Sequence, residues 1–174
     1  EVCFTSGATE ADNLALLGTL RRFAAGKAHL IVSAIEHHAI LHAAQKLEQE
    51  GYAVTYLPVD SQGLVDLQAV ERAIRDDTKL ISIMLVNNEV GSIQPIAEIG
   101  RIAGARSISL HTDAVQAMGF MDVRVKELGV DMLSLSAHKI YGPKGVGALY
   151  VRNGLELVPL VFGGTQEHLL RPGT

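Results

Sequence analysis

The chain contains the stretch Leu133-Ser134-Leu135-Ser136-Ala137-His138-Lys139-Ile140-Tyr141-Gly142-Pro143-Lys144-Gly145-Val146-Gly147. Apolar residues that alternate up to Ser136 predict a buried strand over 132–136, and a Gly- and Pro-rich turn leads into a second strand over 146–151. Lys139 would then lie at the carboxyl end of the first strand, where a lysine is poorly solvated. Desolvation favours the neutral amine, which condenses with an aldehyde. The stretch therefore indicates a nucleophilic amine, and a surface lysine in a turn is the alternative.

The composition is that of a globular chain, because 48% of its 174 residues are hydrophobic, which suffices for one domain with a sizeable core. Fifteen Lys and Arg against nineteen Asp and Glu give a net charge of −4 without basic runs, which argues against nucleic-acid binding and a membrane-surface role. No apolar run approaches the roughly 18–20 residues of a membrane span. The single cysteine, Cys3, fits a reducing compartment, so we expect a cytoplasmic location with an organellar one left open.

Predicted strands and helices alternate along the sequence. Strands are predicted at residues 2–4, 29–33, 52–57, 80–86, 107–111, 132–136 and 146–151. Helices are predicted at residues 11–25, 67–75 and 96–104, and another follows His38 and runs to about residue 49. This alternation is typical of an α/β fold with a doubly wound, mostly parallel sheet. We expect residues 1–174 to be one partial domain, since the sequence opens inside an apolar run and contains no linker.

Polar residues follow the predicted strands. Thr9, His37, Asn88, Asp113 and Lys139 each lie just past a strand or in the loop after it. Ligands bind at the carboxyl edge of an open α/β sheet, so these five side chains predict a functional site. Asp113 and Asn88 also suit ordinary turns, which remains the structural alternative for them.

Two further patterns concern ligands. The turn from Thr5 to Glu10 leads into a helix, whose free N–H groups predict an anion site, although a simple helix cap is the alternative. His37, His38 and His42 suit a solvated helix face; His38 and His42 are spaced to lie together, but we expect no metal site.

Several motifs in order resemble the class V aminotransferase-fold enzymes that use pyridoxal 5′-phosphate (PLP), and most closely the cysteine desulfurases of the iron–sulfur-cluster type. The resemblance implies the large domain of a fold type I, PLP-dependent transferase. The matching motifs are Thr5-Ser6-Gly7-Ala8-Thr9-Glu10-Ala11-Asp12-Asn13, Glu36-His37-His38-Ala39, Val86-Asn87-Asn88-Glu89-Val90-Gly91, His111-Thr112-Asp113-Ala114-Val115-Gln116, Ser136-Ala137-His138-Lys139-Ile140-Tyr141-Gly142-Pro143-Lys144-Gly145, Gly163-Gly164-Thr165-Gln166-Glu167 and Arg171-Pro172-Gly173-Thr174.

The resemblance implies roles around the PLP ring. Lys139 would form the Schiff base with PLP and later carry the substrate's α-proton. Asp113 would keep the pyridine nitrogen protonated, so that the ring acts as an electron sink. His37 would lie over the ring and take part in proton transfer. Asn88 and Gln116 would hold the phenolic oxygen.

The resemblance also implies a phosphate site and a dimer. Thr9, Ser136 and His138 would hold the phosphate, together with backbone N–H groups of the helix after Ala8. Thr174 would reach the phosphate of the partner subunit, which implies a homodimer.

The implied reaction converts L-cysteine to L-alanine and leaves sulfur as a persulfide on an enzyme cysteine, for a sulfur-acceptor or scaffold protein in iron–sulfur cluster assembly or tRNA thiolation. That cysteine would lie beyond Thr174, since Cys3 precedes the phosphate turn, and the resemblance implies an N-terminal segment and a small C-terminal domain outside this chain. We therefore expect these residues alone to be inactive. The alternatives are another class V enzyme, such as a selenocysteine lyase or an aminotransferase, and a non-catalytic truncated scaffold.

Overall fold

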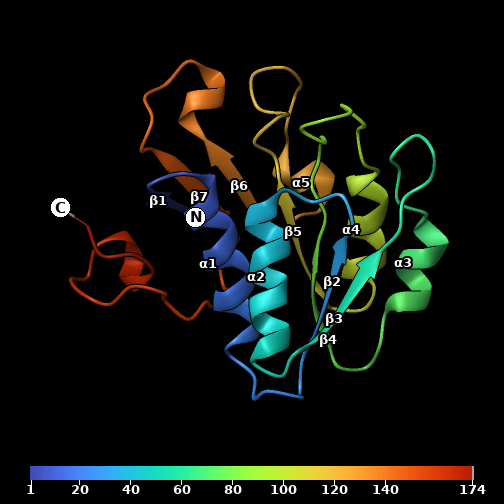
Figure 1. Cartoon of the computed structure of the whole chain (residues 1–174). Coiled ribbons are helices and arrows are strands. Elements are labelled where there is room, and N and C mark those ends of the chain that lie inside the picture. The colour runs from blue at the N-terminus through green and yellow to red at the C-terminus, as the bar shows by residue number, and fades with distance from the viewer. Residues whose placement is uncertain (174) are drawn as a thin grey trace.

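Seven strands of the computed structural model, which describes residues 1–173, form one sheet in the order β1-β7-β6-β5-β4-β2-β3 (Figure 1). The five strands β2 to β6 run parallel, whereas β7 is antiparallel to both β6 and β1. The predicted α/β fold with a doubly wound, mostly parallel sheet is therefore confirmed. The strands are β1 Val2–Thr5, β2 His29–Ser33, β3 Ala53–Leu57, β4 Thr78–Ser82, β5 Ser109–Asp113, β6 Met132–Ser136 and β7 Gly147–Val151.

Helices cover both faces of the sheet (Figure 1). One face carries α1 and α2, and the other carries α3, α4 and the short α5. The helices are α1 Ala8–Leu20, α2 His38–Gln49, α3 Leu67–Ala73, α4 Ile96–Gly104 and α5 Val125–Leu128, with 3-10 turns η1 Ala137–Ile140 and η2 Glu167–Leu169. Within the described residues, no helix has the length and apolar character that crossing a membrane requires.

Alternation along the strands divides the hydrophobic core into two layers. Leu30 and Val32 of β2 face the layer under α1 and α2, while Ile31 between them faces the layer under α3 and α4. A strand covered on both faces reads as a continuous apolar run, which is why β2 was predicted with its correct bounds.

Other boundaries differ from the prediction. Helix α1 spans Ala8–Leu20 rather than 11–25, so it begins directly at the Thr5 to Glu10 turn. Strand β5 starts two residues later than predicted because the chain first turns after α4, where the Ile108 N–H donates to the Ala103 carbonyl. As a result, Asp113 is the last residue of β5.

Strand β4 ends earlier than predicted, yet the chain stays beside β5. The N–H groups of Ile83 and Leu85 donate to the carbonyls of His111 and Asp113 at 3.2 and 2.9 Å. The buried apolar run therefore continues past Ser82 without regular strand geometry. This path carries the loop that contains Asn88 to the edge where β5 ends.

The buried side chain of Glu36 links the loops after β2 and β4 by hydrogen bonds. Its carboxyl group accepts hydrogen bonds from the Met84 N–H at 2.9 and 3.1 Å and from the Ser33 hydroxyl. Burial raises the pKa of Glu36 to about 8, because these donors only partly offset the desolvation of the charge. These hydrogen bonds hold the residue directly before His37 in place.

The raised pKa of Glu36 predicts a pH-dependent stability. Between about 4.5 and 8 the folded state keeps a proton that the unfolded chain has lost, so this group makes the free energy of unfolding fall as pH rises. Glu36→Gln cannot ionise, and its stability relative to the wild type should therefore improve across this range. Urea unfolding at several pH values measures the difference, with the exposed Glu89→Gln as control. A pH-independent difference for Glu36→Gln would contradict the assignment.

Candidate active site

A cavity of about 510 Å3 opens at the carboxyl edge of the sheet, where the loops after β1, β2, β4, β5 and β6 converge. The structure brings nine of the ten predicted site residues to this one cavity. They are Ala8, Thr9, His37, Asn88, Asp113, Gln116, Ser136, His138 and Lys139. The tenth, Thr174, lies outside the described residues.

The amino end of α1 forms one wall of the cavity. Gly7 occupies the N-cap position and no side chain caps the helix, so N–H groups of its first turn remain available to an anion. Glu10 does not compete for this space, because it accepts from the Ser6 N–H and hydroxyl at 2.7 and 2.6 Å and from Arg171 at 2.9 Å. Burial opposes ionisation of Glu10, but these hydrogen bonds outweigh it and lower its pKa. The wall therefore offers donors to a negatively charged group.

The backbone contact between Gly7 and Gly147 brings this wall to the end of β6. A Cβ at Gly147 would lie 2.6 Å from the Gly7 Cα, so only glycine allows the two segments to touch. Ser136, the last residue of β6, lies near that contact, and its hydroxyl is 2.8 Å from His138 Nδ1. A hydroxyl and an imidazole thus join the N–H groups of α1.

Lys139 lies in η1, directly after β6, at the rim of the cavity. Its side chain is exposed to solvent, so the expectation of a poorly solvated amine is wrong for these residues. Strand β6 ends at Ser136, so Lys139 lies in the 3-10 turn η1 outside the buried strand. The turn ends at Tyr141, which has a left-handed conformation with φ of 63°. The cavity therefore has an amine at its rim, that of Lys139, which is accessible to solvent.

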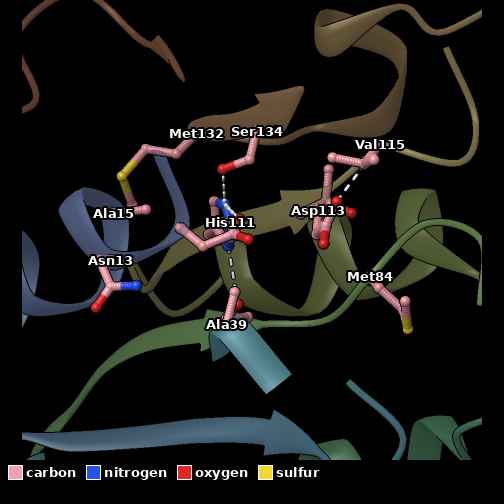
Figure 2. Close-up of polar contacts among 12 residues, drawn as sticks. Asn13, Ala15, Ala39, Met84, His111, Asp113, Val115, Met132 and Ser134 are labelled. Carbon is pink, nitrogen blue, oxygen red and sulfur yellow. Dashed lines mark hydrogen bonds and ion pairs between the residues drawn. The ribbon is translucent and has the colours of Figure 1, made fainter. Parts of the chain in front are cut away.

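Asp113 lies on the cavity floor with 5% exposure and accepts the Val115 N–H at 2.9 Å (Figure 2). Burial raises the pKa of Asp113, while the Val115 hydrogen bond and the nearby His37 oppose this shift. A cation that enters the cavity would find here a carboxyl group with little other compensation.

His37 and Asn88 come from two loops that other residues hold in place. His37 is the N-cap of α2, and its Nδ1 accepts the Ala39 N–H at 3.1 Å, so a neutral ring must carry its proton on Nε2. Asn87 Oδ1 accepts from the N–H groups of Glu89 and Val90, both at 2.9 Å, which leaves Asn88 to face the cavity.

Sequence reasoning missed several residues that line the cavity, chiefly Asp12, Met84 and Lys144. Asp12 left a signal, because it is a charged residue on the buried face of α1. Met84 belongs to an apolar run and Lys144 to a turn, so neither stands out. Within residues 1–173, no three His, Cys, Asp or Glu side chains gather in a way that could hold a metal ion.

Comparisons with known proteins cover the whole chain. The sequence profile of the family described as aminotransferase class-V matches residues 1–170. The chain is 53% identical over 174 residues to the cysteine desulfurase IscS of Clostridium botulinum, strain Kyoto, and 52% identical over 176 residues to the mitochondrial cysteine desulfurase of Saccharomyces cerevisiae. It spans less than half of these relatives, at 44% and 35% of their lengths.

Solved structures give the same result. A structure described as SspA in complex with cysteine has a TM-score of 0.95 and 50% identity, over 99% of this chain and 50% of that one. A NifS-like protein has a TM-score of 0.96 and 44% identity, over 100% of this chain and 48% of that one. The chain belongs to the class-V aminotransferase family and is a homologue of the cysteine desulfurases.

Proposed function

We propose that the protein carrying this chain is a PLP-dependent cysteine desulfurase. In the net reaction, the C–S bond of L-cysteine breaks, the sulfur joins an enzyme thiol as a persulfide, and a proton replaces it on carbon to give L-alanine. The observation that carries the proposal is one cavity that holds an accessible amine, Lys139, and a buried carboxyl group, Asp113, beside the free end of α1. The identity to cysteine desulfurases over the whole chain supports the choice of substrate.

The donor set of the cavity fits PLP. Its volume lies within the range of small-molecule sites. The uncapped turn of α1 with Thr9, and the Ser136–His138 pair, would hold the phosphate. Asp113 would face the pyridine nitrogen, and Asn88 and Gln116 would donate to the phenolic oxygen. When bound, PLP supplies an electron sink for the electron pair left as the substrate Cα–H bond breaks.

The chain's own residues then divide the work of binding and proton transfer. Lys139 Nζ would hold the cofactor covalently, and as a free amine it would carry the substrate's α-proton. The Asp113 carboxylate holds a proton on the pyridine nitrogen through a charge-assisted hydrogen bond. His37, with Nδ1 occupied by Ala39, carries its neutral-form proton on Nε2 and can exchange it in the cavity.

Cys3 does not serve as the sulfur acceptor in this proposal. It is the only cysteine of the chain, it is 2% exposed on β1, and it does not line the cavity. Burial, with Glu167 and Glu10, raises its pKa to about 11, so it stays a thiol and a poor nucleophile. We assign the acceptor to a cysteine outside these 174 residues, in a homodimer that passes sulfur to an acceptor or scaffold protein in a reducing cytoplasm.

Lys139→Ala is expected to abolish covalent attachment of PLP. Intact protein is incubated with PLP and reduced with borohydride, and peptide mass spectrometry locates the added mass. Lys144→Ala, which changes the other lysine of the same cavity, should still carry the mass on Lys139. Attachment that persists in Lys139→Ala, or that lies on Lys144 in the wild type, would contradict the assignment.

Asp113→Asn is expected to weaken PLP binding about tenfold or more, because the amide cannot supply the charge that holds the pyridine proton. Equilibrium dialysis measures the dissociation constant. Asp131→Asn is the matched control, since Asp131 is also buried but is paired with Arg152 at 2.8 Å, outside the cavity lining. Equal losses in both variants would mean that Asp113 acts only through stability.

L-Cysteine is expected to change the absorbance of the PLP-loaded intact protein and to yield alanine and, under reductant, sulfide. Cys3→Ala should do the same at the wild-type rate. A cofactor band that is indifferent to cysteine but responds to selenocysteine or to other amino acids would favour another class V activity. A protein that binds no PLP would refute the proposal.

A further inference from the structure

A row of polar side chains crosses the middle of the sheet beneath α1. Ser82 of β4, His111 of β5 and Ser134 of β6 are all buried, and the imidazole lies between the two hydroxyls. Figure 2 shows His111 and Ser134 joined by their hydrogen bond. Ser82 Oγ is 2.8 Å from His111 Nδ1, and Ser134 Oγ is 2.9 Å from His111 Nε2. Both ring nitrogens therefore have hydroxyl partners.

Asp12 of α1 lies over this row without a hydrogen bond of its own. It is 1% exposed, and within the described residues neither carboxyl oxygen has a hydrogen-bond partner. The basic group beside it is the His111 imidazole, whose Nε2 lies 3.7 Å from Asp12 Oδ1. Asp12 also lines the cavity together with Asp113, so its carboxyl group belongs to the floor of the candidate active site.

Asp12 and Asp113 line this floor, and the carboxyl group of Glu36, buried behind it, acts on both of them electrostatically. The three groups differ in the donors they receive. Glu36 accepts from a hydroxyl and a backbone N–H, Asp113 accepts from one backbone N–H, and Asp12 accepts from none. Within residues 1–173, no Lys or Arg forms an ion pair with any of them. Like charges in a buried site cannot all ionise, and the group with the fewest donors keeps its proton most strongly.

His111 does not provide the missing positive charge. Its ring is fully buried, and burial lowers the pKa of His111 to about 3, so the imidazole is neutral. An ionised Asp12 would therefore be a buried charge without a counterion or a donor, which is a strongly unfavourable state.

We propose that Asp12 is a positioning residue that holds a proton as the neutral acid and so leaves the negative charge of the cavity floor on Asp113. The inference rests on the proposed function, in which that charge faces the pyridine nitrogen of PLP. The neutral acid adds no second charge beside Asp113, and it gains an O–H donor that a carboxylate lacks.

The electrostatic environment agrees with a neutral Asp12 beside a charged Asp113. Burial raises the pKa of Asp12 well above its usual range, and Asp113 and Glu36 raise it further. Only the Ser134 hydroxyl opposes the shift, and it is paired with His111 Nε2 and lies outside hydrogen-bond distance of Asp12. Asp113 has opposing contributions from Val115 and His37. The titratable groups acting on Asp12 are thus Asp113 and His111 of β5 and Glu36 after β2, while β4 and β6 present the hydroxyls of Ser82 and Ser134.

The test is a carboxyl titration in the cofactor-free intact protein, labelled with carbon-13 at the aspartate side-chain carbon and followed by NMR. The wild type should show two perturbed aspartates, of which Asp113 titrates at the lower pH; Asp12→Asn and Asp113→Asn assign the signals. In Asp12→Asn, the pKa of Asp113 should stay within about half a pH unit, because a neutral group has been replaced by a neutral one.

Two results would overturn the proposal. One is an Asp12 signal that titrates below Asp113, and the other is a fall of about one pH unit or more in the Asp113 pKa on Asp12→Asn, as removal of a charge requires. If Asp12→Asn does not fold, the wild type and Asp113→Asn still decide. The one perturbed signal left in Asp113→Asn belongs to Asp12; loss of the Asp113 charge lowers its pKa, but it should still lie above the lower of the two wild-type values, and equality with that lower value would overturn the proposal. Asp131→Asn is the control and should move neither signal.

PLP affinity provides a second readout that separates this inference from the proposed function. Asp12→Asn should change the dissociation constant by less than about threefold, against about tenfold or more for Asp113→Asn. A loss in Asp12→Asn equal to that in Asp113→Asn would mean that Asp12 carries the charge, and it would overturn the inference. A wild-type protein without PLP affinity would refute the proposed function alone, since the carboxyl titration still tests the state of Asp12.

Discussion

The contact between the backbones of Gly7 and Gly147 is the constraint on which the site depends. A Cβ at Gly147 would lie within 2.6 Å of Gly7 and 2.8 Å of the Leu135 carbonyl, so the turn before α1 could not reach β6 and β7 with any other residue there. The contact sets the uncapped end of α1 beside Ser136, and η1 follows immediately with Lys139. The uncapped N–H groups of α1 and the amine of Lys139 thus line one cavity, because the backbones of Gly7 and Gly147 touch without side chains between them.

The protein interior next to the site is polar. In the part of the sheet beneath α1, apolar side chains would give a more stable fold. The row from Ser82 through His111 to Ser134 replaces packing side chains beneath α1, and three carboxyl groups are buried nearby. Buried ionisable groups with few donors destabilise a fold, and such groups gather where function requires them. Two hydrophobic layers on either side of the sheet offset this cost, and strands β2, β4 and β6 contribute apolar side chains to both.

Much of this arrangement could be predicted from the sequence, because it depends on short-range patterns. Buried strands such as β2 are continuous apolar runs, and polar residues directly after them, such as His37, mark the carboxyl edge of a parallel sheet. What could not be predicted depends on three-dimensional contacts. The exposure of Lys139 follows from η1, the late start of β5 from a turn after α4, and the isolation of Asp12 from the side chains above the sheet.

The exposure of Lys139 bears on how the cavity is completed. The floor is shielded from bulk solvent, since Asp113 and Asp12 are 5% and 1% exposed, but Lys139, His37 and Asn88 at the rim are exposed. The proton transfer that we propose for Lys139 Nζ would need an amine shielded from bulk water. The residues described here shield the floor and leave the rim open, so shielding of the amine requires the bound cofactor and substrate, or protein outside this part of the chain. The chain spans less than half of its relatives. Its described residues supply the buried carboxyl groups of the cavity floor and the uncapped end of α1 that borders the cavity.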